Sequence, residues 1–431
     1  LDTTPFKRPV AIFQNSEFGG QAQLAWSEAE VPKSLICQQE SLPVQLVEEG
    51  GKSKLLFAVP ESALGRVAVA DLSDAKPVNP PRLKVSSRRM ENAEISVRFD
   101  ANGNIASIKT LDEDPIEFIL PGHLANLFQV LEDKPLFWDA WDTEIYGQET
   151  VVNLSKSERF SVVESGPVRV AVEREIQFGK SKIVQRISLG PTPGIRFDHW
   201  VDWQEDHKFL KVAFPFNVNT QKATYEIQFG HVERPTHRNT SWDLARFEVC
   251  AQKWADLSEG GHGIAIINAG KYGYDCHGST LRLSLLRSPK APDPICDRGH
   301  HEFSFVVLPH YDTLAHSDVV QAAYAFNAEP HVIQTRPSKG QIAEFPVFVS
   351  VDTRHLIVEC VKKAEDSNRR IVRLYECHNT RGHAHLSCVA PIRRAWLCDL
   401  EENRLQDLEI VDGSVKFEYT PFEILTVMIE A

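Results

Sequence analysis

The sequence predicts a mainly β protein assembled from β-sandwiches, and three observations lead to that prediction. Its 23 glycines and 25 prolines recur along all 431 residues and divide the chain into short segments. Those segments are β-branched or aromatic runs, and only one stretch has convincing helical spacing. Many short strands with few helices are typical of sandwiches. The strand candidates are residues 10–13, 67–70, 95–99, 168–176, 183–189, 211–214, 225–229, 263–267, 281–286, 303–308, 345–349, 357–361 and 415–419.

Residues 94–110 carry the clearest local signal. Apolar and polar residues alternate over 95–99, which places the apolar ones on a single face of a strand. Asn102-Gly103 then supplies a turn before a second apolar run at 105–108. We therefore expect a β-hairpin at this position.

Breaks in the strand pattern divide the chain into three parts. Residues 74–82 hold three prolines, which cannot occupy the interior of a strand ladder, so this stretch is interpreted as a linker. A second boundary is expected at 334–340, shortly after the one helix candidate at 318–327. The expected organisation is a small β-sandwich domain over 1–80, a large β domain over 81–335 and a C-terminal small β-sandwich domain over 336–431.

The composition excludes two classes of protein. The chain has 47 Lys and Arg against 59 Asp and Glu, a net charge of −12, so no excess of basic residues is available for nucleic acid. No apolar run in the sequence approaches the length of ~20 residues that a helix needs to span a bilayer, which excludes a membrane protein. The hydrophobic and charged fractions are those of an ordinary soluble globular chain.

The chain does not begin as a translated protein begins. It starts with Leu1, and its methionines are Met90 and Met428. A removed leader and a C-terminal part of a longer polypeptide are the two explanations, and the first residues lack the pattern of a retained signal peptide. The sequence therefore suggests a fragment of a longer chain.

The densest cluster of chemically useful side chains is residues 132–142, with three aromatics and four acids. Indole rings pack on the apolar faces of sugar rings while carboxylates accept hydrogen bonds from hydroxyls, so this composition suits a sugar site. The alternative is buried tryptophan in a sheet with capped acids. Asp139 and Asp142 are three residues apart, so in a regular strand they point to opposite faces, and acting together requires a bend or loop.

A second polar and aromatic stretch is residues 198–208. Strand geometry puts His199 and Trp203 on one face and Trp200 on the other, so we expect a central strand covered on both sides. The eight-residue separation of His199 and His207 matches no metal signature, and a structural role is favoured.

Cysteines and histidines give weak evidence for metal binding. The eight cysteines are scattered, without the dense spacing of a disulfide scaffold, so reduced thiols in a cytosol-like compartment are expected. Residues 377–388 hold Cys377, His378, His383, His385 and Cys388. If residues 371–377 and 383–390 form a hairpin, His383 and His385 share a face and could chelate as a pair, while Cys388 points away. No third and fourth ligand then converges from this segment, so a zinc site is disfavoured. We predict no metal site and no complete catalytic set in this chain.

Several long segments resemble the C-terminal half of glycoside hydrolase family 38 α-mannosidases of the cytosolic or vacuolar type. The resemblance is strong over residues 90–431 and weaker before them. The matching segments are EDKP at 132–135, WDAWD at 138–142, HWVDW at 199–203, ATYEIQFG at 223–230, RPTH at 234–237, NTSWD at 239–243, WADLSEGG at 254–261, KYGYD at 271–275, LSLLRSP at 283–289, RLYE at 373–376 and RG at 381–382.

The resemblance implies a fold and a function. The fold is a large, galactose-mutarotase-like β-supersandwich flanked by smaller β-sandwich domains. The function is that of the C-terminal portion of a retaining α-mannosidase, which removes terminal α-linked mannose from oligosaccharides in the cytoplasm or vacuole. In this family the catalytic aspartates and the zinc ligands lie in an N-terminal barrel and the helices after it. The resemblance therefore implies zinc bound outside this chain and an isolated chain without activity.

The resemblance also suggests which residues face the substrate. The large β domain of similar enzymes packs against the barrel and lends residues to the sugar pocket. The segments 138–142 and 285–288 are the expected lining, with Arg287 as a donor to sugar hydroxyls or, alternatively, as one half of an interdomain ion pair. The predicted substrate-binding residues are Trp138, Asp139, Trp141, Asp142 and Arg287.

Two other functions stay open at this stage. The first is a non-catalytic carbohydrate-binding module in which Trp138, Trp141 and the neighbouring acids form a platform for mannose-containing oligosaccharides. The second is an oligomerisation module, since the family's enzymes commonly assemble into oligomers. Binding of mannose that is lost on Trp141→Ala separates the first from a purely structural wall, and light scattering tests the second.

Overall fold

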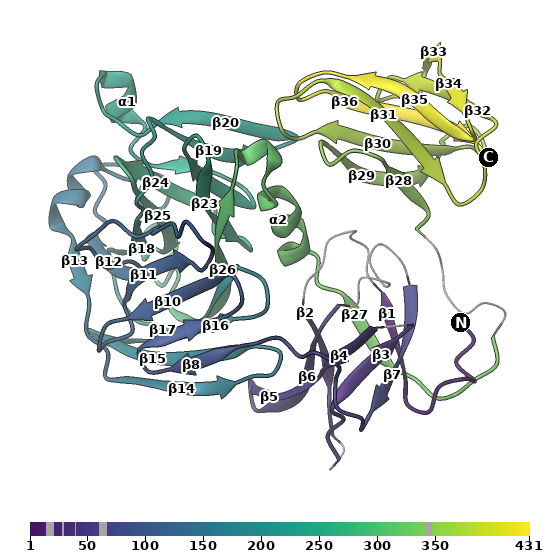
Figure 1. Cartoon of the computed structure of the whole chain (residues 1–431). Coiled ribbons are helices and arrows are strands. Elements are labelled where there is room, and N and C mark those ends of the chain that lie inside the picture. The colour runs from purple at the N-terminus through teal and green to yellow at the C-terminus, as the bar shows by residue number, and fades with distance from the viewer. Residues whose placement is uncertain (14–20, 28–29, 39, 60–66, 341–346) are drawn as a thin grey trace.

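The computed structural model describes residues 1–13, 21–27, 30–38, 40–59, 67–340 and 347–431, and it confirms a mainly β fold (Figure 1). All strand pairs are antiparallel, and the chain forms a small sandwich, a large β domain and a C-terminal sandwich. The predicted strand at 345–349 lies partly outside the described residues. The other candidates lie within or overlap observed strands.

The first small sandwich contains a five-stranded and a three-stranded sheet. Its core is a separate apolar cluster that includes Leu35, Leu55 and Phe57. The chain returns to this sandwich late, because its last strand pairs Val10 with Gln334. The strands are β1 (Pro9–Phe13), β3 (Ser34–Cys37), β4 (Glu40–Pro43), β7 (Val67–Ser73) and β27 (His331–Gln334), with β2 (Gln21–Ala25), β5 (Gln45–Glu49) and β6 (Lys52–Ala58) in the second sheet.

The large β domain stacks three sheets around one continuous apolar core, as expected of a supersandwich. The nine-stranded sheet contains β14 (Arg159–Ser165), β15 (Val170–Phe178), β16 (Ser181–Leu189), β17 (Ile195–Trp203), β19 (Lys222–Ile227), β20 (Gly230–Pro235), β22 (Trp254–Ser258), β23 (His262–Asn268) and β26 (Gly299–Tyr311). The six-stranded sheet contains β12 (Leu127–Glu132), β13 (Val152–Leu154), β18 (Lys208–Pro215), β21 (Val249–Cys250), β24 (Gly273–His277) and β25 (Thr280–Leu286). The four-stranded sheet contains β8 (Lys84–Ser86), β9 (Arg89–Glu91), β10 (Ile95–Phe99) and β11 (Ile105–Thr110).

The predicted hairpin and central strand are both present. β10 and β11 pair around a turn in which Gly103 has φ +78°, a conformation that glycine adopts without strain. β17 lies inside the nine-stranded sheet between β16 and β26. Its inward face, with His199 and Trp203, is buried, but the outward face at Trp200 is only half-buried. The prediction that both faces of β17 are covered therefore holds fully for the inward face and only partly for the outward face.

A buried polar network lies under β17. The guanidinium of Arg174 on β15 donates to Gln185 Oε1 at 2.7 Å, to Asn104 Oδ1 at 2.8 Å and to the Asn126 carbonyl at 2.7 Å. Gln185 Nε2 in turn lies 2.8 Å from His199 Nε2. The Arg174 bond fixes the orientation of the Gln185 amide, so the amide donates and His199 Nε2 accepts. His199 is therefore a neutral structural residue, as expected.

Acidification is expected to destabilise the protein through His199. Burial lowers the pKa of His199 to about 3, below the ~6.5 of an exposed histidine, so the unfolded chain binds a proton first as pH falls. The loss amounts to about 1.4 kcal/mol for each pH unit below ~6.5. NMR titration of the His199 ring, together with urea unfolding at pH 7 and 5.5, measures it. A native His199 that titrates near pH 6.5 would contradict this account.

The C-terminal sandwich corrects one prediction. Residues 371–377 and 383–390 do not form a hairpin, because β30 pairs with β29 and β36 while β31 pairs with β28 and β35 in the opposite sheet. The first sheet contains β29 (Leu356–Lys363), β30 (Arg370–Glu376), β32 (Arg394–Cys398), β33 (Arg404–Asp407) and β36 (Ile424–Glu430). The second contains β28 (Val349–Val351), β31 (Gly382–Cys388), β34 (Glu409–Val411) and β35 (Ser414–Tyr419).

The predicted helix is α2 (Val319–Asn327), which lies between the large domain and the C-terminal sandwich (Figure 1). Its buried residues, Val319 and Ala323 among them, share an apolar cluster with Ile357 and Tyr375 of that sandwich. The shorter helices are α1 (Ser241–Ala245), η2 (Ile145–Thr150) and η3 (Leu314–His316). Of the helices in the described ranges, none has the length and apolar character to cross a membrane.

Candidate functional site

The site predicted from the aromatic and acidic cluster is a loop. Residues 135–142, called the aromatic loop from here on, follow β12 and precede η2. The bend that the sequence required is present: Trp138 has φ +55°, and its carbonyl accepts hydrogen bonds from the backbone N–H groups of Trp141 at 2.8 Å and Asp142 at 2.9 Å. The turn places both indole rings on one short segment.

The side chains of the aromatic loop face solvent. Trp138 is 71% exposed and Trp141 is 68% exposed, and their ring centroids lie 6.4 Å apart with the planes at 82°. Leu136 and Phe137 are exposed to the same degree. The alternative of tryptophans buried in a sheet is therefore wrong. An exposed group of four large apolar side chains is characteristic of a binding surface.

Arg287 anchors the loop from the end of β25. Its Nε and Nη2 donate to the two carboxylate oxygens of Asp133 at 2.7 and 2.8 Å. Nη2 also donates to the carbonyl of Asp142 at 2.6 Å, with the Asp139 carbonyl at 3.4 Å. The guanidinium lies 5.4 Å from the ring centroid of Phe209. Within this chain, the ion pair of Arg287 therefore lies inside the large domain.

Asp139 and Asp142 have different surroundings. The Asp139 carboxylate accepts hydrogen bonds from the backbone N–H groups of Lys290 and Ala291, and His207 Nδ1 lies 3.5 Å from it. These contacts tie the loop to the segment after β25 and make Asp139 a structural acceptor. Asp142 is exposed and is held through its carbonyl, so its carboxylate faces solvent beside Trp141.

The structure brings the two expected lining segments together. Trp203 Nε1 on the central strand donates to Ser288 Oγ at 2.7 Å, which fixes the segment 285–288 on the buried side. Arg287 of that segment then holds the aromatic loop on the outer side. The roles of Trp138, Asp139, Trp141, Asp142 and Arg287 in sugar binding stay predictions.

Replacing Arg287 with methionine is expected to release the aromatic loop. The change leaves Asp133, which is 3% exposed, as a buried carboxylate without its cation and removes the bond to the Asp142 carbonyl. Chymotrypsin cleaves after aromatic residues, so its cleavage in the native loop is expected to accelerate at least roughly tenfold. Arg298→Met, which removes a partly exposed ion pair with Asp206, is the control. Equal cleavage of both variants would contradict the anchor.

The cysteine and histidine segment does not form a metal centre. His355 Nδ1 and His378 Nδ1 lie 3.1 Å apart, with Cys377 Sγ 3.4 Å from His378 Nδ1. Burial lowers the pKa of His378 to about 3 and raises the pKa of the Cys377 thiol, so both are neutral. Within the described ranges no three His, Cys, Asp or Glu side chains are placed to hold a metal ion. The described residues of this segment therefore do not fit a resident zinc.

Two features of this surface escaped the sequence analysis. Asp133 was counted among the acids of the cluster, but its role as the buried partner of Arg287 needs the spatial contact. Trp242 at the start of α1 is 75% exposed, and this region is joined to η2 by a 2.9 Å bond from Arg238 to Gln148. The sequence did offer a signal for this second feature. A tryptophan follows Asn239-Thr240, and Thr240 caps the short helix that begins there.

Two family models match this chain. The model of the "Glycosyl hydrolases family 38 C-terminal domain" matches residues 90–295, which include the aromatic loop and Arg287. The model of the "Glycosyl hydrolases family 38 C-terminal beta sandwich domain" matches residues 355–427. This chain belongs to the C-terminal region of glycosyl hydrolase family 38. The two matches together cover almost two thirds of it.

Individual relatives extend the family-38 match. The chain is 38% identical to human alpha-mannosidase 2C1 over 392 residues, which are 88% of this chain and 37% of that protein. It is 37% identical to alpha-mannosidase G of Dictyostelium discoideum over 78% of this chain and 32% of that one. The chain thus spans about a third of the length of these curated relatives.

A solved structure shows the same fold. An alpha-mannosidase from Enterococcus faecalis superposes with a TM-score of 0.77 over the whole of this chain and 57% of its own, at 15% identity. At that identity the comparison establishes the fold of the family-38 region.

Proposed function

We propose that this family-38 region is the C-terminal portion of a retaining α-mannosidase that removes terminal α-linked mannose from oligosaccharides. In this proposal the chain supplies the wall of the sugar pocket, and the reaction centre lies outside it. The catalytic nucleophile, the acid/base carboxyl and zinc are supplied by a catalytic barrel that is not among these residues. A cytoplasmic or vacuolar location is proposed with it, and the eight cysteines, which form no disulfide with one another, are compatible with a reducing compartment.

One observation carries the proposed role of the chain. Trp138 and Trp141 are exposed on a loop whose backbone is anchored by Arg287 and by the Asp139 carboxylate. Exposed indoles cost solvation unless a partner covers them, and a rigid loop loses little entropy when it is covered. Sugar rings present apolar C–H faces to such indoles, while the free carboxylate of Asp142 accepts from hydroxyls.

A mannoside assay tests whether the reaction centre lies outside this chain. The 431-residue chain is expected to release no product from an aryl α-mannoside, with or without added zinc. The complete polypeptide is expected to hydrolyse the aryl α-mannoside with retention of configuration at the anomeric carbon. NMR of the released sugar measures that configuration. Robust turnover by the purified chain would overturn the placement of the reaction centre, and a complete polypeptide that cleaves no α-mannoside would overturn the function.

The same preparation tests a second candidate, a carbohydrate-binding module, which the exposed tryptophan pair also favours. Titration of the chain with mannose and manno-oligosaccharides measures it. Saturable binding that is lost on Trp141→Ala supports a sugar platform that works without the barrel. Absence of binding supports the other proposal, in which these residues contact the sugar only when the catalytic barrel completes the pocket. Light scattering of the same sample reports whether the chain self-associates.

A further inference from the structure

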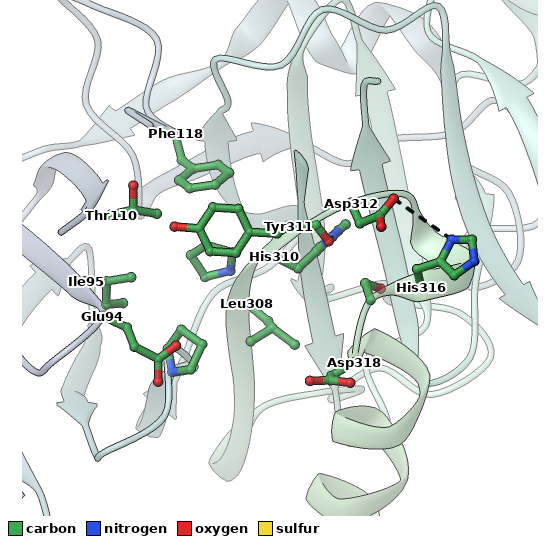
Figure 2. Close-up of a pocket in the computed structure, with 13 residues that line it drawn as sticks. Glu94, Ile95, Thr110, Phe118, Leu308, His310, Tyr311, Asp312, His316 and Asp318 are labelled. Carbon is green, nitrogen blue, oxygen red and sulfur yellow. Dashed lines mark hydrogen bonds and ion pairs between the residues drawn. The ribbon is translucent and has the colours of Figure 1, made fainter. Parts of the chain in front are cut away.

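A separate pocket of about 260 Å³ lies between the β10–β11 hairpin and the segment that follows β26 (Figure 2). Its apolar surface includes Ile95 from the hairpin, Phe118 and, at the end of β26, Leu308. The volume is close to that of pockets that hold small molecules. None of the residues discussed for sugar binding lines this pocket, so it is distinct from the aromatic loop.

Three carboxylates are among the polar side chains of this pocket. They belong to Glu94, Asp312 and Asp318, and among the described residues no lysine or arginine lines the pocket. Asp318 is paired with Arg354 at 2.6 Å, and Asp312 lies 3.9 Å from His316. These two carboxylates therefore have cationic or titratable partners.

Glu94 differs from the other two carboxylates. Within the described part of the chain its carboxylate has neither an ion pair nor a hydrogen bond, although it lies beside the apolar wall. Glu94 is exposed but partly desolvated, and this partial desolvation raises the pKa of its carboxyl. On the same side, Tyr311 donates its hydroxyl to Asp112, a second carboxylate for which the described residues provide no cationic partner. The hairpin side of the pocket thus carries uncompensated negative charge.

The remaining groups around the pocket are fixed or neutralised. His310 Nε2 lies 2.8 Å from Asp256, and although burial opposes protonation, that carboxylate raises the pKa of His310. The His310 charge is therefore balanced within the protein. Arg354 of the C-terminal sandwich donates to the carbonyls of His316 and Ser317 at 2.9 and 2.6 Å, which holds the opposite wall in place. A pocket with such fixed walls is preorganised for a ligand.

We propose that this pocket binds a small organic ammonium ion with an apolar body. The ammonium pairs with Glu94, and the body packs against Ile95, Phe118 and Leu308. Anions are disfavoured because the lining offers carboxylates and no lysine or arginine. A neutral hydroxylated ligand leaves the charge of Glu94 unbalanced, so it is expected to bind less tightly.

Three probes, of which benzylamine and benzyl alcohol match in size, test the charge requirement by calorimetry and ligand-observed NMR at pH 7. Benzylamine is expected to bind saturably to the 431-residue chain, and benzyl alcohol and mannose to bind at least roughly tenfold more weakly. Added salt is expected to weaken benzylamine binding, since the contact is ionic. Equal binding of benzylamine and benzyl alcohol, tighter binding of mannose, or no benzylamine binding up to tens of millimolar would overturn the proposal.

Matched variants locate the binding. Glu94→Gln removes the charge of an exposed residue and is expected to weaken benzylamine binding at least roughly tenfold, with an unchanged melting temperature. Glu302→Gln, an exposed carboxylate on β26 outside the pocket, is the control and is expected to bind as the parent chain does. Binding that is unaffected by Glu94→Gln, or weakened equally by both variants, would overturn the assignment to this pocket.

Discussion

Replacing Arg174 with methionine is expected to lower the free energy of unfolding of the large domain by about 3–5 kcal/mol. Arg174 is 1% exposed and donates to Gln185, Asn104 and the Asn126 carbonyl in the core. Methionine fills similar volume but donates nothing, so these buried acceptors lose the bonds from Arg174. Gln185 Oε1 is then left with its 2.8 Å bond from Asn126 Nδ2.

Chemical denaturation monitored by tryptophan fluorescence measures this loss. Arg159→Met is the control, because Arg159 on β14 is largely exposed and its pair with Glu173 is worth less than about 1 kcal/mol. A loss in Arg174→Met no larger than that in Arg159→Met would show that the network does not hold the sheets together. Near-UV circular dichroism confirms that both variants are folded before the comparison is made.

Removing the indoles of the aromatic loop is expected to lower kcat/KM for an α-mannoside on the order of tenfold to hundredfold in the complete polypeptide. This expectation rests on the proposed function. Trp138→Ala and Trp141→Ala each delete a ring that is about 70% exposed in this chain, so the fold is expected to tolerate both changes. The physical reason is the loss of apolar surface against the sugar ring.

Trp242→Ala is the matched control for these variants. Trp242 is equally exposed but lies on α1, outside the aromatic loop. Its removal is expected to leave kcat/KM within about twofold. If all three variants keep the parent kcat/KM, the loop is not part of the sugar pocket. If Trp242→Ala alone lowers it, the pocket wall lies at α1.

Local patterns predicted the strands but not all of their partners. Alternation over residues 95–99 identified β10 and its hairpin, because face and turn are both local properties. β30 and β31 were also recognisable as strands, but they belong to opposite sheets, with partners elsewhere in the sandwich. Periodicity indicates which side chains of a strand share a face. It carries no information on which other strand pairs with that strand. The prediction of a hairpin formed by β30 and β31 was therefore wrong.

The candidate site shows the same limit. The composition of residues 132–142 indicated an aromatic, acidic surface, and the spacing of Asp139 and Asp142 required a bend that is present. The anchor joins Arg287 to Asp133 across 154 residues of sequence, and no local pattern reports such a pair. The sequence likewise did not indicate the positive φ of Trp138 at the turn.

Hydrogen–deuterium exchange of the complete polypeptide, with and without a saturating mannose-configured imino sugar, tests the central claim most directly. If the aromatic loop is a wall of the sugar pocket, the amides of residues 135–142 exchange more slowly when the inhibitor is bound, while those of α1 exchange as before. Unchanged exchange in the aromatic loop, under conditions where inhibition is complete, would contradict the account.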